Sequence, residues 1–245
     1  MSTALPTPRQ DWALFLDLDG TLIDFAPTPD GVVVPAELRD TLAALHRALG
    51  GAVALVSGRA LVVLDALFTP LILPASGQHG AELRLGGEKV SVPPHPAMPA
   101  IAVALDTFAA AHPGVRIENK GHSIAVHYRG APAMADKARE VVDNLIAAAG
   151  DALEPMPGQM VIDIKRRGLS KGSAVAWFMA RAPFAERVPV FIGDDRTDED
   201  GFAAVNERRG LSIRIGSSSD TAASFCIATP AALREWLATI VRCYG

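Results

Sequence analysis

Three short apolar runs, each followed by polar residues, constrain the fold of this 245-residue chain more than any other feature. They cover residues 12–18, 52–56 and 188–192. Apolar runs without alternation are typical of strands buried on both faces, as in parallel sheets. A helical pattern opened by Pro35 and closed by Gly50-Gly51 lies between the first two runs, and a helix over 170–182 precedes the third. This order predicts an α/β fold with a parallel sheet.

A different pattern lies between these two parts of the chain. The Pro-Pro-His-Pro stretch at 93–96 predicts a linker, followed by helices over 98–111 and 131–149 and strands over 115–119, 122–128 and 160–165. Within the last strand, Ile162 and Ile164 alternate with Asp163 and Lys165. We therefore expect a smaller inserted domain, 94–164, whose sheet has two helices on its apolar face and a free charged face. The core would comprise 1–93 and 165–245.

Reactive polar residues follow all three runs. In open α/β sheets, ligands bind beyond the carboxyl ends of the strands, so these side chains should converge. Gathered carboxylates repel one another, and Mg²⁺ held by oxygen ligands would relieve that repulsion. Lys171 lies in the first turn of its predicted helix, where the helix dipole disfavours a cation unless an anion such as a phosphoryl group is near. The residues at the strand ends are Asp17, Asp19, Ser57, Arg59, Asp194, Asp195 and Asp198.

Several of these residues also have a purely structural interpretation. Asp17 and Asp19 would suit an Asx-type turn with Gly20, and Thr197-x-x-Asp200 resembles a capping box. Ser57 would suit the N-cap of a helix beginning near Ala60, a role compatible with phosphate binding. Lys171 would be a solvated cation, and Arg59 would have a solvated or structural role. These alternatives fit single residues, but the complete set at three strand ends favours a catalytic site.

Charge and composition exclude several classes of partner. The formal net charge is −4 and no long Lys/Arg run occurs, so the chain lacks the basic surface that nucleic-acid binding requires. The first residues lack the features of a signal peptide, and no apolar stretch reaches the roughly 18 residues of a membrane span. We expect a cytoplasmic protein without membrane partners.

Four ordered motifs resemble those of the haloacid dehalogenase superfamily: Asp17-Leu18-Asp19-Gly20-Thr21, Ser57-Gly58-Arg59, Lys171 and Gly193-Asp194-Asp195-x-x-Asp198. Further stretches at 76–82, 118–121, 127–129, 164–172 and 193–202 resemble the trehalose-6-phosphate phosphatase family. The resemblance implies a Rossmann-like core with an inserted α/β cap. It also implies Mg²⁺-dependent hydrolysis of trehalose 6-phosphate to trehalose and phosphate, in trehalose biosynthesis, through an aspartyl-phosphate.

The resemblance also implies individual roles. Asp17 would attack phosphorus, and Asp19 would act as general acid and then as general base. Asp17, the Asp19 backbone carbonyl and Asp194 would hold Mg²⁺. The position of Asp163 is usually Glu in the family, which puts its sugar contact in question. The resemblance further implies that phosphate is bound by Thr21, Ser57, Gly58 and Lys171. The sugar would be bound by Glu118, Lys120, Asp163 and His79. The residues implied to support the site are Arg59, Asp195 and Asp198.

Two other functions compete with this one. The first is a phosphatase for another sugar phosphate, such as sucrose phosphate or a mannosylglycerate phosphate, because the core chemistry would be the same. The second is a catalytically silent domain that binds a phosphorylated sugar or regulates a synthase. Retention of Asp17, Asp19, Lys171 and Asp194 favours an enzyme. The family also implies functional coupling to a trehalose-6-phosphate synthase.

Overall fold

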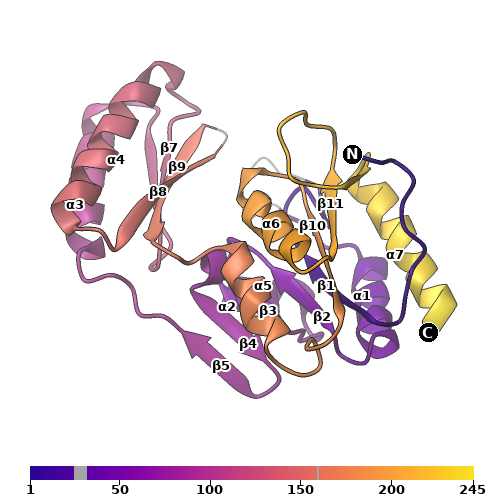
Figure 1. Ribbon diagram of the computed structural model, residues 1–245. Helices are drawn as coiled ribbons and strands as arrows, with labels where there is room; N and C mark the ends of the chain where they lie inside the picture. The colour runs from indigo at the N-terminus through magenta and orange to yellow at the C-terminus, as the bar shows by residue number, and fades with distance from the viewer. Residues whose placement is uncertain (25–31, 159) are drawn as a thin grey trace. The chain divides into compact units, whose positions relative to one another are not determined.

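The computed structural model describes residues 1–24, 32–158 and 160–245. The chain forms two compact units (Figure 1). Unit 1 combines Met1–Ser91 with Ser170–Gly245, and unit 2 is Val92–Leu169. Unit 2 is thus inserted into unit 1 along the sequence.

Unit 1 is built on a mostly parallel sheet, which confirms the predicted α/β class. Neighbouring strands from β12 through β3 run parallel, whereas β3, β4 and β5 pair antiparallel at one edge. In the described part of the chain the order of the eight strands is β12 (Phe225–Ile227), β11 (Leu211–Ile215), β10 (Val188–Gly193), β1 (Trp12–Leu16), β2 (Val53–Val56), β3 (Ala75–Gly77), β4 (Glu82–Leu85) and β5 (Glu88–Ser91).

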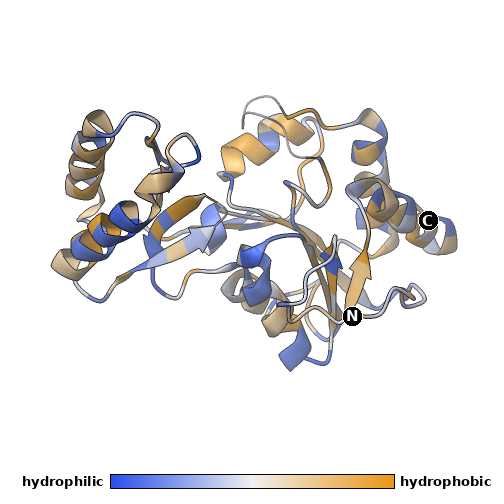
Figure 2. Cartoon of the chain, turned by 90° about the horizontal axis from the view of Figure 1, so that it is seen from above, coloured by the Kyte–Doolittle hydropathy of each residue, from blue (hydrophilic) through white to orange (hydrophobic). Residues whose placement is uncertain are grey.

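Helices cover both faces of this sheet, and alternate residues of β1 show how. Leu14 and Leu16 pack in one apolar cluster with α1 (Ala36–Ala48), α2 (Leu61–Phe68) and α7 (Pro230–Tyr244). Ala13 and Phe15 pack in a second cluster with α5 (Lys171–Met179) and α6 (Glu199–Glu207). Figure 2 shows hydrophilic and hydrophobic residues alternating along the helices, as expected when one helix face is buried. The apolar runs are therefore strands buried on both faces.

One helix of unit 1 is shorter than the sequence pattern predicts. The expected helix over 170–182 ends at Met179. The residue before a proline disfavours helical backbone, and Pro183 follows Ala182 directly. Ser170 is the N-cap, because its side chain accepts a hydrogen bond from the Ser173 backbone N–H.

Unit 2 contains a four-stranded antiparallel sheet, β6 (Arg116–Asn119), β7 (Ile124–His127), β9 (Val161–Arg166) and β8 (Leu153–Gly158), in that order. Helices α3 (Met98–Ala111) and α4 (Ala135–Ala149) pack with Ile162 and Ile164 in one apolar cluster. Figure 1 shows both helices on the same face of the sheet. The predicted arrangement of two helices on the apolar face is confirmed, and the charged face is the other one.

Three details of unit 2 differ from the sequence expectation. Strand β8 was not predicted, because Pro155 and Pro157 interrupt its pattern; proline is tolerated there since β8 is an edge strand. Strand β9 extends to Arg166, which pairs with Leu153, and so passes the predicted end of the inserted domain at residue 164. The helix expected over 131–149 begins at Ala135, after a 3₁₀ turn over Pro132–Met134.

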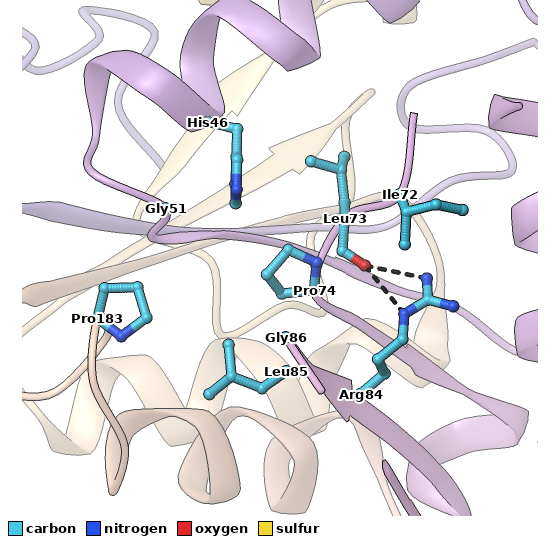
Figure 3. Close-up of a pocket in the computed structure, with 9 residues that line it drawn as sticks. All are labelled: His46, Gly51, Ile72, Leu73, Pro74, Arg84, Leu85, Gly86 and Pro183. Atoms are coloured by element: carbon cyan, nitrogen blue, oxygen red, sulfur yellow. Dashed lines mark hydrogen bonds between the residues drawn. The ribbon is translucent and has the colours of Figure 1, made fainter. Parts of the chain in front are cut away.

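A pocket of about 230 Å³ lies in unit 1 (Figure 3). It is lined by His46 at the end of α1, Gly51 before β2, Pro74 before β3 and Pro183 after α5, among others. These positions lie at the amino ends of the strands, so the pocket is separate from the carboxyl ends where the acidic residues follow β1 and β10. Within the described ranges, no helix is both long and apolar enough to traverse a bilayer.

The packing of Phe178 on α5 leads to a stability prediction. Its ring is fully buried, with centroids 5.9 Å from Phe15 and 5.0 Å from Phe184. Phe178→Ala should lower the free energy of unfolding by about 3–5 kcal/mol, because it leaves a cavity. Val62→Ala, at a side chain that is 73% exposed, should change it by less than about 1 kcal/mol. Urea titration followed by circular dichroism measures both, and equal effects would contradict the packing.

Candidate active site

Two neighbouring parallel strands of the sheet bring the first and last acidic motifs together. Strands β1 and β10 are parallel neighbours, with Leu16 opposite Ile192, and the Asp17 N–H donates to the Ile192 carbonyl at 3.0 Å. Asp17 therefore lies beside Asp194, which follows β10. Carboxylate oxygens of Asp17, Asp194 and Asp198 all lie within 4.8 Å of one another. The predicted convergence of these aspartates at the carboxyl edge is confirmed.

Lys171 lies at the centre of this acidic cluster. Its Nζ donates to Asp17 Oδ1 at 2.7 Å and to Asp198 Oδ1 at 2.7 Å. All three side chains are nearly excluded from solvent, with exposed fractions of 4%, 6% and 0% for Lys171, Asp17 and Asp198. Lys171 is the first residue of α5, so two carboxylates offset the unfavourable helix dipole. The solvated-lysine alternative is therefore wrong.

Asp198 supports the cluster with both of its oxygens. Oδ1 is bound to Lys171, and Oδ2 accepts from the backbone N–H groups of Asp194 and Asp195 at 3.0 Å each. The chain passes so close that a Cβ on Gly193 would lie 2.1 Å from Asp198 Cγ. Asp198 thus fixes the turn that presents Asp194.

The capping box in this turn differs from the predicted one. The sequence suggested Thr197 with Asp200, whereas the box is formed by Asp195 and Asp198 around a 3₁₀ turn over Arg196–Asp198. Asp195 Oδ1 accepts from the Thr197 N–H at 2.8 Å and from its hydroxyl at 2.7 Å. The box lies two residues earlier because the 3₁₀ turn precedes α6.

Thr21 is placed against a carboxylate. The side chain is fully buried, and its hydroxyl donates to Asp194 Oδ1 at 3.0 Å. In this structure Thr21, predicted as a phosphate ligand, orients Asp194. Asp17 and Asp194 thus present carboxylate oxygens from two adjacent strands, a donor set that suits a hard divalent cation. Asp198 is less suited to that role, because Lys171 and two N–H groups occupy its oxygens.

Arg59 makes a two-point ion pair with Asp19. Nε donates to Asp19 Oδ2 at 2.7 Å and Nη2 donates to Oδ1 at 2.8 Å. Such a fork-like pair fixes the plane of the carboxylate as well as its position. The pair joins the segments after β1 and β2, so the solvated alternative for Arg59 is wrong.

Ser57 directly follows β2 and is 1% exposed. Its Oγ accepts from the Arg59 N–H at 3.1 Å. The expected N-cap role is wrong, because α2 begins at Leu61 after Ala60, which makes no side-chain cap. The Ser57 hydroxyl is thus not used to begin the helix.

Burial and like charge shift the protonation of the cluster. Burial raises the pKa of Asp17 to about 7, against the opposing effect of Lys171. Burial raises the pKa of Asp194 to about 7 as well, with Asp198 and Asp195 reinforcing the shift. Burial would lower the pKa of Lys171, but Asp17 and Asp198 outweigh it, so that pKa lies well above its usual value. One buried lysine does not neutralise all these carboxylates, and a further cation would be attracted here.

A second polar group lies on the charged face of the sheet in unit 2. Lys120 Nζ donates to Asp163 Oδ1 at 3.2 Å and lies 3.9 Å from Glu118 Oε2. The structure thus brings together the three unit 2 residues that were predicted to contact a sugar. His127 joins them, since its Nε2 lies 3.0 Å from Glu118 Oε2. His127 was not assigned from the sequence, although its place on β7 opposite Arg116 puts it on the same face.

His79 is the fourth residue that was predicted to contact the sugar. It belongs to unit 1, in a 3₁₀ turn over Gln78–Gly80, and its side chain is buried. A Cβ on Gly58 would lie 2.7 Å from the His79 ring. The structure therefore places His79 against the Ser57-Gly58-Arg59 segment, whereas Glu118, Lys120 and Asp163 belong to unit 2.

Comparisons with known proteins agree with these motifs. The family model described as trehalose-phosphatase matches residues 15–230. The chain belongs to the trehalose-phosphatase family. It is 43% identical over 240 residues to a protein of Escherichia coli (strain K12) named trehalose-6-phosphate phosphatase, covering 97% of this chain and 90% of that protein.

Solved structures share the fold at lower identity. The C-terminal domain of trehalose-6-phosphate phosphatase from C. albicans matches with a TM-score of 0.82 and 21% identity, covering 95% of this chain and 92% of that one. BT1666 from Bacteroides thetaiotaomicron, a phosphatase of the haloalkanoate (HAD) superfamily, matches with a TM-score of 0.65 and 17% identity, covering 98% and 99%. The family resemblance and the HAD fold predicted from the sequence are thus confirmed, and the family is one of phosphomonoester hydrolases.

The raised pKa values predict how the stability of the metal-free protein depends on pH. Asp17 and Asp194 bind protons more tightly in the folded chain than at their ordinary pKa of 3.8. Folding therefore takes up protons between about pH 4 and 7, and stability is lost as the pH rises through 7. Asp194→Asn keeps an oxygen for Thr21 and removes one of these groups.

Urea midpoints at pH 5.5, 6.5 and 7.5, with a chelator present, measure this effect. The midpoint of the unchanged protein should fall with pH, and the fall should be shallower for Asp194→Asn. Identical slopes would show that Asp194 does not retain its proton in the folded chain.

Proposed function

We propose that this protein hydrolyses trehalose 6-phosphate to trehalose and inorganic phosphate through a phosphoryl group carried on Asp17. The observation that carries the proposal is the buried Lys171 between Asp17 and Asp198, beside Asp194. This arrangement positions a carboxylate nucleophile next to a fixed positive charge. Membership of the trehalose-phosphatase family supports the choice of substrate.

In the first step, a carboxylate oxygen of Asp17 attacks phosphorus and the bond from phosphorus to the sugar oxygen breaks. That sugar oxygen takes a proton from the Asp19 carboxyl group. Lys171 neutralises charge near the reacting phosphoryl group. We assign the binding of the phosphoryl oxygens to the Ser57 hydroxyl, the Gly58 N–H and Lys171. Thr21, bound to Asp194 here, would then support the metal ligand.

We propose Mg²⁺ as the metal of this site. Asp17, Asp194 and the Asp19 backbone carbonyl would hold it, with Asp195 and Asp198 in support. When bound, it would neutralise the carboxylates and polarise the phosphoryl oxygens. The buried carboxylates with raised pKa values are the observation that supports a cation of this charge and hardness.

In the second step, Asp19 accepts a proton from water as the water oxygen attacks phosphorus. The bond from phosphorus to Asp17 breaks, which releases phosphate and restores the Asp17 carboxylate. Both oxygens of Asp19 accept hydrogen bonds from Arg59 in this structure. Each of these oxygens keeps a second lone pair that can take the proton, so Arg59 can orient Asp19 through both steps.

We assign recognition of the sugar to unit 2, which corresponds to the cap domain predicted at residues 94–164. Glu118, Lys120 and Asp163 form a connected polar group there, with His127 bound to Glu118. Sugar hydroxyl groups bind to paired donors and acceptors of this kind. Asp163 is shorter than the usual Glu, but its bond to Lys120 gives it a defined orientation. His79, whose ring lies against Gly58 in unit 1, remains a candidate sugar contact from that unit.

The competing functions differ from this one in specific residues. A phosphatase for sucrose phosphate or a mannosylglycerate phosphate would share the core and depend on other cap contacts. A silent regulatory domain would not need Lys171 between two carboxylates beside Asp194, an arrangement that suits turnover. Coupling to a trehalose-6-phosphate synthase and a cytoplasmic location remain predictions from the sequence.

Phosphate release from trehalose 6-phosphate, sucrose 6-phosphate and glucose 6-phosphate, with and without Mg²⁺, tests the substrate assignment. We expect the highest kcat/KM for trehalose 6-phosphate and loss of activity in a chelator. Equal kcat/KM values for the three sugars would contradict the substrate. Release that is unchanged by a chelator would contradict the metal.

Asp17→Asn tests the nucleophile. The amide has nearly the same shape but lacks the nucleophilic carboxylate oxygen, so kcat should fall by about a thousandfold or more. Asp11→Asn, at an exposed aspartate that pairs with Arg9, is the matched control and should retain activity. Circular dichroism checks that both variants fold. A folded Asp17→Asn protein with a tenth of the original kcat or more would exclude Asp17 as the nucleophile.

Lys120→Ala tests the role of the cap. Loss of its charged hydrogen bonds should raise KM for trehalose 6-phosphate by about tenfold. Hydrolysis of p-nitrophenyl phosphate, which lacks the sugar, should be unchanged. Lys137→Ala on the exposed side of α4 is the matched control and should alter neither substrate. An equal loss with both substrates would place Lys120 in the core chemistry instead.

A further inference from the structure

Helix α2 begins without a cap from its own sequence. Ala60 occupies the N-cap position and makes no side-chain hydrogen bond, and the first turn has no acidic residue. The first N–H groups of a helix need acceptors from elsewhere. The Leu61 N–H finds one in Glu82 Oε2, at 2.8 Å. A carboxylate 21 residues further along the chain thus takes the place of the missing cap.

The contact between Glu82 and Leu61 lies next to Ser57-Gly58-Arg59, which we call the phosphate-binding segment because of its proposed role. Leu61 is two residues after Arg59, and α2 therefore continues directly from Ser57-Gly58-Arg59. Because Glu82 satisfies the helix end, the Ser57 hydroxyl is not required there. Ser57 Oγ instead accepts from the Arg59 N–H, and its O–H remains a donor suited to a phosphate oxygen.

Backbone hydrogen bonds also join residues 76–79, which precede Glu82, to the segment Ser57-Gly58-Arg59. The Ser57 N–H donates to the Ser76 carbonyl at 2.9 Å, and the Gln78 N–H donates to the Arg59 carbonyl at 3.0 Å. The His79 N–H donates to the Ser57 carbonyl at 3.3 Å. Residues 76–82 thus hold both ends of the phosphate-binding segment, and Glu82 is the side chain that fixes its exit into α2.

Close approach leaves little freedom in this contact. A Cβ on Gly77 would lie 2.8 Å from Glu82 Oε2 and 2.9 Å from the Leu61 nitrogen. Only glycine leaves room for the carboxylate to reach the helix there. On the other side, a Cβ on Gly80 would lie 2.8 Å from the Ser170 carbonyl oxygen, next to Lys171. The loop therefore packs against both segments that bear the proposed phosphate ligands.

We propose that Glu82 is a positioning residue that aims Ser57 and the Gly58 N–H at the phosphoryl group by anchoring the first turn of α2. The inference rests on the proposed function, since it takes Ser57 as a phosphate ligand. Glu82 acts through the backbone and does not touch the substrate. Removing its carboxylate leaves the Leu61 N–H without this acceptor, so the link from the phosphate-binding segment to α2 becomes less rigid. The Ser57 hydroxyl and the Gly58 N–H then no longer point at the phosphoryl group.

The test compares Glu82→Ala, Glu82→Gln and Glu88→Ala, using inorganic phosphate as the probe. Glu82→Ala should raise both KM and the inhibition constant of phosphate by about tenfold, with a smaller change in kcat. Glu82→Gln keeps an oxygen acceptor for Leu61 and should remain within about threefold of the unchanged protein. Glu88, on the same hairpin, pairs with Arg181 at the surface, and its removal should change neither constant.

A double-mutant cycle with Ser57→Ala separates positioning from general destabilisation. If Glu82 acts through Ser57, then Glu82→Ala should raise the inhibition constant of phosphate much less in the Ser57→Ala background. If Glu82→Ala does not fold, Glu82→Asp, which keeps the charge but has a shorter reach, replaces it with the same expected direction. The Mg²⁺ concentration for half-maximal activity should stay unchanged in every folded variant.

Two results would overturn the proposal: an inhibition constant within twofold of the unchanged protein for Glu82→Ala, or an equal increase with and without Ser57. Phosphate binding by calorimetry reports on Glu82 independently of the sugar substrate. Failure of the proposed function would appear differently, as absence of phosphate release from trehalose 6-phosphate by the unchanged protein.

Discussion

The buried ion pairs of Lys171 are the interaction on which the rest of the site depends. Removing charges from water is costly, and a buried ammonium group is tolerated only when its partners and hydrogen bonds are well placed. Asp17 and Asp198 supply those partners at 2.7 Å from two different strand ends. The sheet order, with β1 beside β10, and the start of α5 at Lys171 are what make that geometry possible.

A layered arrangement of supports follows from this cluster. Asp198 holds the turn of Asp194, Thr21 orients the Asp194 carboxylate, and Arg59 fixes Asp19. The Thr21 and Arg59 contacts join segments that are distant in sequence, so the site is preorganised by the fold rather than by any one loop. Preorganised charges need no rearrangement as charge develops on the phosphoryl group, which is the electrostatic basis of the proposed catalysis.

The sequence predicted the strands and the convergence of their ends, because both follow from local patterns. An apolar run predicts a buried strand, and parallel strands place their carboxyl ends together. The position of Lys171 in the first turn of a helix signalled a nearby anion, and Asp17 and Asp198 are those anions. The alternation along β9 likewise placed Asp163 on the charged face of its sheet.

What the sequence could not provide depends on contacts between distant residues. Ser57 is a residue type that favours the N-cap position, but the Leu61 N–H at the start of α2 donates to Glu82 instead. Strand β8 was hidden by two prolines that only an edge position permits.

The central claim, that Asp17 carries the phosphoryl group, is tested most directly by borohydride trapping during turnover of trehalose 6-phosphate. Mass spectrometry should find homoserine at position 17 alone; homoserine at another aspartate, or none with substrate turning over, would contradict the account.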